Sequence, residues 1–170
     1  MDKVRFNNKT YPGFQAEGNA ARFAIPFAES VCRGKGLDIG YCKPEWKLEG
    51  AIGVDLADDT PYHANNLPPG KHDYIFSSHC LEHVDNWVET LELWLDSVRS
   101  GGTLFLYLPD FSQEYWRPWH NRKHKHCLTP EILRGFFEDK GYADPVDPIT
   151  RLWVSERDLN NSFMVLVEVM

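Results

Sequence analysis

Two groups of residues in this sequence could carry out chemistry: aspartates that follow short apolar segments, and closely spaced histidines. Asp38 and Gly40 lie in "GLDIG", and Asp55 lies at the end of "AIGVDL". A carboxylate can accept hydrogen bonds from an ammonium group or a hydroxyl, and a glycine lets the backbone approach a ligand closely. A carboxylate at the end of a second strand, such as Asp55, is suited to both hydroxyls of a ribose. The alternative is that both aspartates cap neighbouring loops.

The histidines fall mainly into two stretches. "HCLEH" places His79 and His83 four residues apart, and "HNRKHKHC" contains His120, His124 and His126. Positions four apart share one face of a helix, as metal ligands often do. However, the first stretch lacks the glutamate that follows the first histidine of zinc proteases, and the second matches no standard zinc spacing. We therefore expect no metal, and a metal-dependent hydrolase is an alternative that bound metal would reveal.

The second histidine stretch belongs to a long aromatic and basic segment, residues 111–128. Long loops in compact domains are commonly binding loops. We expect this segment to hold an acidic acceptor such as a sugar phosphate, a nucleotide sugar or a carboxylate. Its basic residues Arg117, Arg122, Lys123 and Lys125 and its histidines could hold such an anion, and the candidate substrate-binding residues are Arg117, His120, Arg122 and His124. The alternative is a solvated basic loop that balances an acidic surface.

Length and charge restrict the possible functions. The 170 residues fit one domain, 1–170, in which the polar and turn-rich residues 1–17 form an N-terminal arm. The chain has 18 basic and 25 acidic residues and a net charge of −7, which disfavours nucleic acid as a partner. A small-molecule substrate fits this balance better.

The cysteines and the hydropathy pattern indicate the compartment. Four cysteines occur without a CxxC pair, and we find no signal peptide and no long apolar run. Reduced thiols in a cytoplasmic protein without a membrane segment are therefore expected. The sequence does not indicate the oligomeric state.

The elements that must position these residues alternate along the chain. Apolar periodicity, caps and glycine stops predict helices over residues 19–33, 85–99 and 129–141, with Asp85 and Thr129 as N-caps. Strands are predicted over residues 36–40, 51–56, 72–78, 103–109, 149–154 and 162–170. Near-continuous apolar strands separated by helices predict an α/β protein with a mostly parallel sheet covered on both faces. Ligands bind such sheets outside the carboxyl ends of the strands.

The order and spacing of four motifs resemble a known family. "LDIG", "GVDL", "LPPGKHDYIFSSHCLEHVDN" and "SGGTLFLYLPD" follow one another as in the class I S-adenosylmethionine-dependent methyltransferases, and are most similar to the methyltransferase type 11 branch. The resemblance covers roughly residues 20–142. It implies a Rossmann-like methyltransferase fold with an antiparallel C-terminal strand, S-adenosylmethionine as the cofactor, and methyl transfer to a small molecule.

The resemblance also assigns roles to individual residues. It implies that Asp38 and Gly40, followed by Tyr41, line the methionine end of the cofactor. It implies further that Asp55 holds the ribose hydroxyls and that Leu56 packs against the adenine. The wall beneath the sulfonium is expected to consist of Ser77, Ser78 and His79, and Pro109 and Asp110 are expected to face the methyl acceptor.

The chain departs from the family pattern at two points. The second glycine of the D-x-G-x-G loop is replaced by Cys42, whose side chain crowds the backbone path unless the loop is rerouted, and Lys43 could then pair with the cofactor's carboxylate. The acid that usually contacts the adenine amine is missing. Asn66 lies in that neighbourhood, and its carbonyl can accept the same hydrogen bond less strongly.

For a hydroxyl acceptor, methyl transfer needs a base. His79 is the first candidate because the ordinary pKa of histidine lies near neutrality, and His126 and Asp110 are the reserve candidates. The rival interpretation is a catalytically inactive methyltransferase-like domain that binds a cofactor or a partner, for which the altered loop is the evidence. A Rossmann domain for NAD is disfavoured because the chain has no G-x-G-x-x-G.

Overall fold

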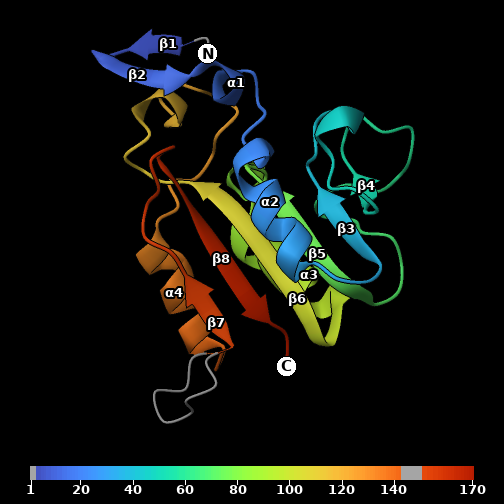
Figure 1. The fold of residues 1–170 in the computed structure, drawn as a ribbon. Coiled ribbons are helices and arrows are strands. Elements are labelled where there is room, and N and C mark those ends of the chain that lie inside the picture. Colours follow the sequence, from blue (N-terminus) through green and yellow to red (C-terminus); the bar gives the residue numbers. More distant parts are fainter. Residues whose placement is uncertain (1–2, 143–150) are drawn as a thin grey trace.

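The apolar segments of the chain form a six-stranded sheet in the computed structural model, which describes residues 3–142 and 151–170 (Figure 1). The strand order is β4-β3-β5-β6-β8-β7. The first four strands of this order are parallel, and β8 runs antiparallel to both of its neighbours. The strands are β3 (Gly36–Ile39), β4 (Ile52–Val54), β5 (His72–Ser78), β6 (Val98–Pro109), β7 (Leu152–Val154) and β8 (Ser162–Glu168). This sheet confirms the predicted fold class.

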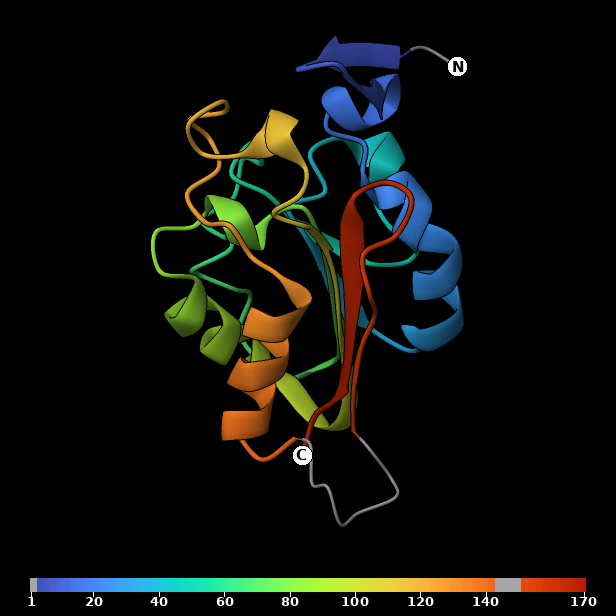
Figure 2. The same ribbon diagram turned by 90° about the vertical axis from the view of Figure 1, so that its left-hand side faces the viewer.

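The helices cover both faces of the sheet (Figure 2). One face carries α2 (Ala21–Val31), whose small residues Ala24 and Ala28 allow close packing against Phe76 and Phe105. The other face carries α3 (Trp87–Ser97) and α4 (Pro130–Asp139), and includes the fully buried Trp94. Because both faces are covered, the central strands can be apolar throughout, as predicted.

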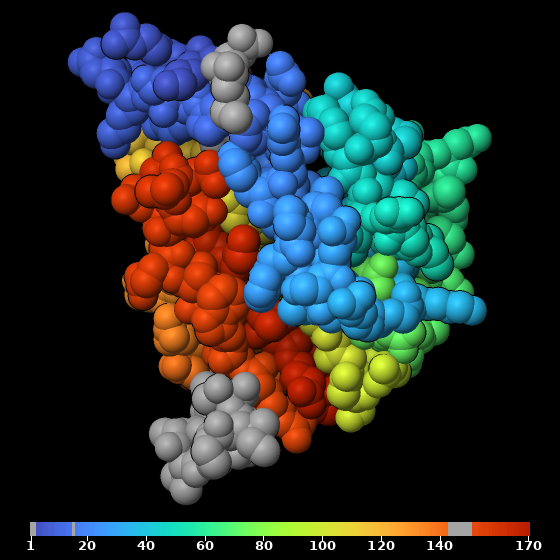
Figure 3. Space-filling model, in the orientation of Figure 1, coloured from blue at the N-terminus to red at the C-terminus, as the bar shows by residue number. Residues whose placement is uncertain are grey.

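The N-terminal arm folds into a small unit of its own. A two-stranded antiparallel hairpin of β1 (Lys3–Phe6) and β2 (Lys9–Pro12) is followed by the short helix α1 (Gly13–Ala16). The hairpin lies beyond the carboxyl ends of the parallel strands, against the ochre segment that follows β6 (Figure 1 and Figure 3). Three 3-10 turns complete the described structure: η1 (Pro44–Trp46), η2 (Leu81–His83) and η3 (Glu114–Trp116).

Several predicted boundaries are wrong. The N-cap of α3 is Asn86 and not Asp85, because the Asn86 side chain accepts the hydrogen bond from the Glu89 N–H. The strand predicted over residues 103–109 begins at Val98, so that its glycines lie within β6. Pro26 lies inside α2, which is continuous over Ala21–Val31. Thr129 caps α4 as predicted.

The parallel part of the sheet contains a topological switch. The chain passes from β3 to β4 at one edge and then returns to β5 on the other side of β3. The loops that follow β3 and β5 therefore diverge and leave a crevice outside the carboxyl ends of these strands, where α/β sheets bind ligands. No helix within the described residues is long and apolar enough to cross a membrane.

Candidate functional site

A cavity of about 820 Å³ lies outside the carboxyl ends of β3, β4 and β5. Five segments line it: the loops after β3 and after β4, the turn after β5, the N-terminal arm and the segment after β6. The main lining residues used below are Phe6, Gly40, Cys42, Asp55, Leu56, Ser78, His79, His83, His120, Lys123, His124 and Lys125.

The loop after β3 keeps the backbone of a glycine turn. Gly40 has φ +78°, and a Cβ added to it would lie 2.6 Å from both the Cβ and the Sγ of Cys80, so only glycine fits. Cys42 has φ +66°, a left-handed conformation that side-chain-bearing residues rarely adopt. Its N–H donates to Asp55 Oδ2 at 3.0 Å. The cysteine therefore occupies a glycine conformation that links this loop to the end of β4.

Asp55 and the exposed residue that follows it form one wall of the cavity. Asp55 Oδ1 accepts a hydrogen bond from the Ala57 N–H at 3.0 Å, and the half-buried carboxylate keeps capacity for further donors. Leu56 is 84% exposed. An apolar side chain presented beside a carboxylate in this way suits a ligand with a flat apolar part and adjoining hydroxyls.

Asp38 and Tyr41, both expected at the cofactor, do not line the cavity. The carboxylate of Asp38 is buried and accepts from the Leu48 N–H at 2.7 Å. Burial raises the pKa of Asp38 to about 7, against the opposing effect of the Leu48 hydrogen bond. The Tyr41 hydroxyl donates to Asp58. In this structure the Asp38 carboxylate therefore caps the loop that follows β3, which is the alternative role considered for it from the sequence.

Ser77 and Asn66 also lie outside the cavity wall. The Ser77 hydroxyl is buried and donates to the Ile39 carbonyl at 2.9 Å, which joins β5 to β3. The Asn66 amide donates to the Pro61 carbonyl at 2.8 Å, and its neighbour Asn65 lines the cavity instead. Sequence spacing located this region, but the turn decides which amide faces the cavity.

His79 lies at the floor of the cavity in an unusual backbone conformation. With a φ of +51°, its ring lies between Ser162 of β8 and Glu82 of η2. Nε2 lies 3.0 Å from Ser162 Oγ, and Nδ1 lies 3.7 Å from Glu82 Oε1. Burial, together with His124 and His83, lowers the pKa of His79 well below its ordinary value. The lowered pKa keeps the ring neutral at pH 7 and also makes it a weaker base than an ordinary histidine.

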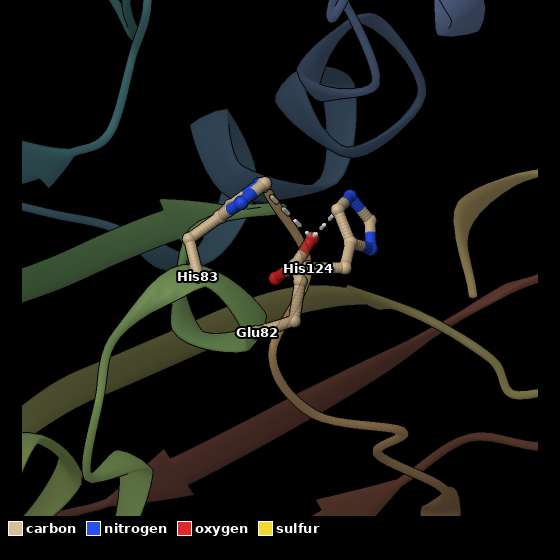
Figure 4. A group of neighbouring side chains, drawn as sticks. All are labelled: Glu82, His83 and His124. Carbon is tan, nitrogen blue, oxygen red and sulfur yellow. Dashed lines mark ion pairs between the residues drawn. The ribbon is translucent and has the colours of Figure 1, made fainter. Parts of the chain in front are cut away.

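Glu82, which sequence reasoning did not single out, is the most unusual residue of the site (Figure 4). It is fully buried, and within the described residues neither carboxylate oxygen has a hydrogen-bond partner. Oε1 lies 3.8 Å from His83 Nε2 and 4.0 Å from His124 Nε2. Burial raises the pKa of Glu82 to about 7, and burial lowers the pKa of His124 to about 3. In the sequence, the only pointer to Glu82 was its position beside His83 in "HCLEH".

The two reserve bases lie elsewhere. Asp110 and His126 line a separate small cavity and not the large one. Asp110 Oδ1 accepts from the Ser112 N–H at 2.9 Å, and His126 Nε2 donates to the Val84 carbonyl at 2.9 Å. Both side chains therefore serve local structure here.

Only two of the four candidate substrate-binding residues in the basic segment after β6 line the cavity. His120 and His124 line it, whereas Arg117 and Arg122 do not. Arg117 donates to the Phe111 carbonyl at 2.8 Å and lies over the Phe111 ring. The cations at the wall are Lys123 and Lys125, two other basic residues of the same predicted binding segment.

The hairpin closes the cavity from above by packing on the same segment. The Phe6 ring lies 5.5 Å from that of Tyr115 and 4.7 Å from that of His120, both edge-on. Lys9 pairs with Glu114 at 2.9 Å. The arm and residues 111–128 thus form one cover over the cavity.

Comparison with known proteins agrees with this geometry. Residues 17–144 match the sequence model of a methyltransferase domain family. Similar solved structures include a SAM-dependent methyltransferase of Thermotoga maritima (TM-score 0.67, 15% identity, 92% of this chain and 93% of that one). NodS, an N-methyltransferase of Bradyrhizobium japonicum in complex with S-adenosylhomocysteine, is also similar (0.61, 12%, 94% and 88%).

A third similar structure is a Haloferax volcanii methyltransferase in complex with the activator Trm112 (TM-score 0.64, 13% identity, 92% and 91%). No curated protein matches the chain in sequence. At these identities the structural matches establish the fold, and the family match covers most of the chain.

Proposed function

Because this chain belongs to the methyltransferase domain family, whose methyl donor is S-adenosylmethionine, we propose that it transfers a methyl group to a small acidic acceptor bound beneath the cover. The supporting observation is that one cavity of about 820 Å³ is lined both by the strand ends and by the basic segment after β6. Such a volume is in the range of small-molecule and cofactor sites.

The residues at the strand ends fit this cofactor. Asp55 would accept from the ribose hydroxyls, Leu56 would pack on the adenine, and Gly40 would let the backbone approach the methionine end. Ser78 supports the fit, since its buried hydroxyl has no partner within the described residues and borders the cavity. When bound, S-adenosylmethionine supplies an electrophilic methyl carbon on its sulfonium.

The acceptor would be held from the opposite wall. Lys123 is exposed and borders the cavity, and His120 borders it beside the hairpin. An ammonium group at the edge of a cavity favours a phosphate or carboxylate, as in an acidic sugar or a nucleotide sugar. We propose that residues 1–17 and 111–128 form this acceptor side of a single domain, 1–170.

His79 is the proposed catalytic base. For a hydroxyl acceptor, a neutral imidazole at the cavity floor can take the proton as the oxygen attacks the methyl carbon. Nε2 contacts Ser162 at 3.0 Å, whereas Nδ1 lies 3.7 Å from Glu82, beyond a hydrogen bond, so Nδ1 is the nitrogen that would take the proton. Orientation of the two reactants in one cavity would supply much of the rate enhancement.

Methyl transfer would be tested with isotopically labelled S-adenosylmethionine and a panel of phosphorylated, carboxylated and uncharged sugars. The proposal predicts incorporation into acidic acceptors only, a Lys123→Gln variant with a higher KM for the acceptor, and unchanged kinetics for Arg122→Gln. Labelling confined to uncharged acceptors would contradict the acidic class. Cofactor binding without any transfer would favour the inactive, ligand-binding alternative.

A further inference from the structure

The buried carboxylate of Glu82 is surrounded by imidazoles at 3.7–4.0 Å and has no hydrogen-bond partner in the described part of the chain. Both oxygens are inaccessible to solvent, and neither makes a hydrogen bond of normal geometry within the described part of the chain. Leaving such a group unpaired is costly, so unpartnered buried oxygens in native proteins indicate an ordered water or an ion. Glu82 therefore points to a bound species.

His83 is held in the orientation and tautomer of a metal ligand. Its Nδ1 lies 2.8 Å from the Lys123 carbonyl oxygen, which can only accept, so Nδ1 carries the hydrogen. The other nitrogen, Nε2, then bears a lone pair and lies 3.8 Å from Glu82 Oε1. A backbone carbonyl that fixes the far nitrogen is the usual support of a ligating histidine.

His124 approaches the same carboxylate oxygen from a distant part of the chain (Figure 4). Its Nε2 lies 4.0 Å from Glu82 Oε1. The ring is buried, stacks on Trp116 with 5.4 Å between centroids and 10° between planes, and meets His83 edge-on at 4.5 Å. The segment is held here, since the Lys125 N–H donates to the Glu82 carbonyl at 2.7 Å.

We propose that Glu82, His83 and His124 bind a divalent transition-metal ion of the zinc class. One ligand atom from each residue lies within 4.8 Å of the other two. Ligand atoms around zinc lie about 3.3 Å apart in a tetrahedron with bonds of about 2.0–2.2 Å, so an inward shift of about 0.5–1 Å would close the site. Two imidazoles and one carboxylate are a known ligand set for zinc that keeps a fourth position open.

The open position would face the large cavity, which His83 and His124 line. A metal there can hold an anionic oxygen and lower the pKa of a bound hydroxyl. This role in activating the acceptor rests on the proposed methyl transfer, whereas the metal site itself does not. His79, whose Nδ1 lies 3.7 Å from the same Glu82 oxygen, would stand beside the bound acceptor.

Metal binding would be measured on the full chain, freed of metal by chelation and titrated with Co²⁺ and then Zn²⁺. The variants are Glu82→Gln, His83→Gln and His124→Gln, and His120→Gln is the matched control because His120 lines the same cavity outside the cluster. Visible Co²⁺ absorption reports the coordination geometry, and equilibrium dialysis reports the stoichiometry.

The proposal predicts one Co²⁺ per chain with tetrahedral or five-coordinate absorption, displaced by Zn²⁺. Each ligand substitution should weaken binding by at least about 100-fold, since loss of supporting residues alone costs about 10–100-fold. His120→Gln should bind as the parent does. These results require no enzymatic activity, so they are separable from failure of the methyl-transfer assay.

Absence of stoichiometric binding by the parent chain, or equal binding by all four variants, would overturn the proposal. If the three variants fail to fold, X-ray absorption spectroscopy of the zinc-loaded parent protein would identify the metal ligands instead. Two imidazoles and an oxygen donor would support the site, whereas a shell of oxygens or of three or more imidazoles would contradict it.

Discussion

The two walls of the cavity are built in different ways. The strand-end wall (Gly40, Cys42, Asp55, Leu56 and Ser78) comes from the ends of neighbouring strands, and the Cys42 N–H donates to Asp55 within it, while the Ser78 hydroxyl has no partner in the described residues. The histidine wall joins Glu82 and His83 to His124, which belongs to a distant segment, and it buries a carboxylate without a hydrogen-bond partner among the described residues. The strand-end wall is therefore held by backbone hydrogen bonds. The histidine wall is tightly packed, but the carboxylate of Glu82 in it has no hydrogen-bond partner within the described residues.

The largest effect is expected from breaking the strand-end wall at Gly40. Gly40→Ala should reduce the free energy of unfolding by about 3–5 kcal/mol, from left-handed strain and overlap with Cys80. Gly50→Ala is the matched control, because Gly50 has φ +77° and no atom within 4 Å of an added Cβ. It should lose only about 1–2 kcal/mol. Equal losses in denaturant titrations would show that the contact with Cys80 does not matter.

The buried Asp38 gives the same wall a dependence on pH. Its folded pKa of about 7 lies above the unfolded value, so the stability that this group contributes is present at low pH and lost as pH rises towards and through 7. Asp38→Asn should remove this loss, and its stability relative to the parent should rise between pH 4 and 7 by about 2–4 kcal/mol. Parallel stability curves for the two proteins would contradict the raised pKa.

The left-handed backbone conformation of Cys42 is strained, and glycine at this position should remove the strain. Cys42→Gly should stabilise the protein by about 1 kcal/mol, which raises the melting temperature by about 2–4 °C. Cys42→Ala keeps the backbone strain and removes the thiol, so it should show no gain. A gain in both variants would assign the effect to the side chain and not to the backbone.

A small and selective effect is expected where the hairpin covers the acceptor side. Phe6→Ala removes the ring contacts with Tyr115 and His120 and should raise the KM for the acceptor by a few-fold, since one aromatic pair contributes about 0.5–1.5 kcal/mol. Binding of S-adenosylhomocysteine should not change. Arg5→Ala, an exposed residue of the same strand, is the control. A changed cofactor affinity would show that the two walls are not separable.

The fold could be predicted from the sequence because its signals are local. Apolar runs such as that of β6 and the Thr129 cap of α4 depend on neighbouring residues, and these define a parallel sheet. Boundaries were less predictable, because Asp85 and Asn86 are both good caps and only the observed hydrogen bond distinguishes them.

The site was predictable only in part. Asp55 and His79 could be placed at the cavity because they follow strands, and the strand ends meet at one edge. Glu82 could not, because its importance arises from burial beside His124, which tertiary packing alone brings near. Arg122 was chosen over Lys123 as a substrate-binding candidate, because a long loop has no local signal that sets which side chain faces inward.

The central claim is that the strand-end wall binds S-adenosylmethionine, and thermal-shift titration with S-adenosylmethionine and S-adenosylhomocysteine tests it most directly. A ligand at about 100 times its Kd adds about 2.7 kcal/mol of stability. The parent protein should melt several degrees higher, Asp55→Ala should lose that shift, and Asp59→Ala, which removes a nearby exposed carboxylate, should keep it. No shift with either ligand at millimolar concentration, or an undiminished shift in Asp55→Ala, would contradict the claim.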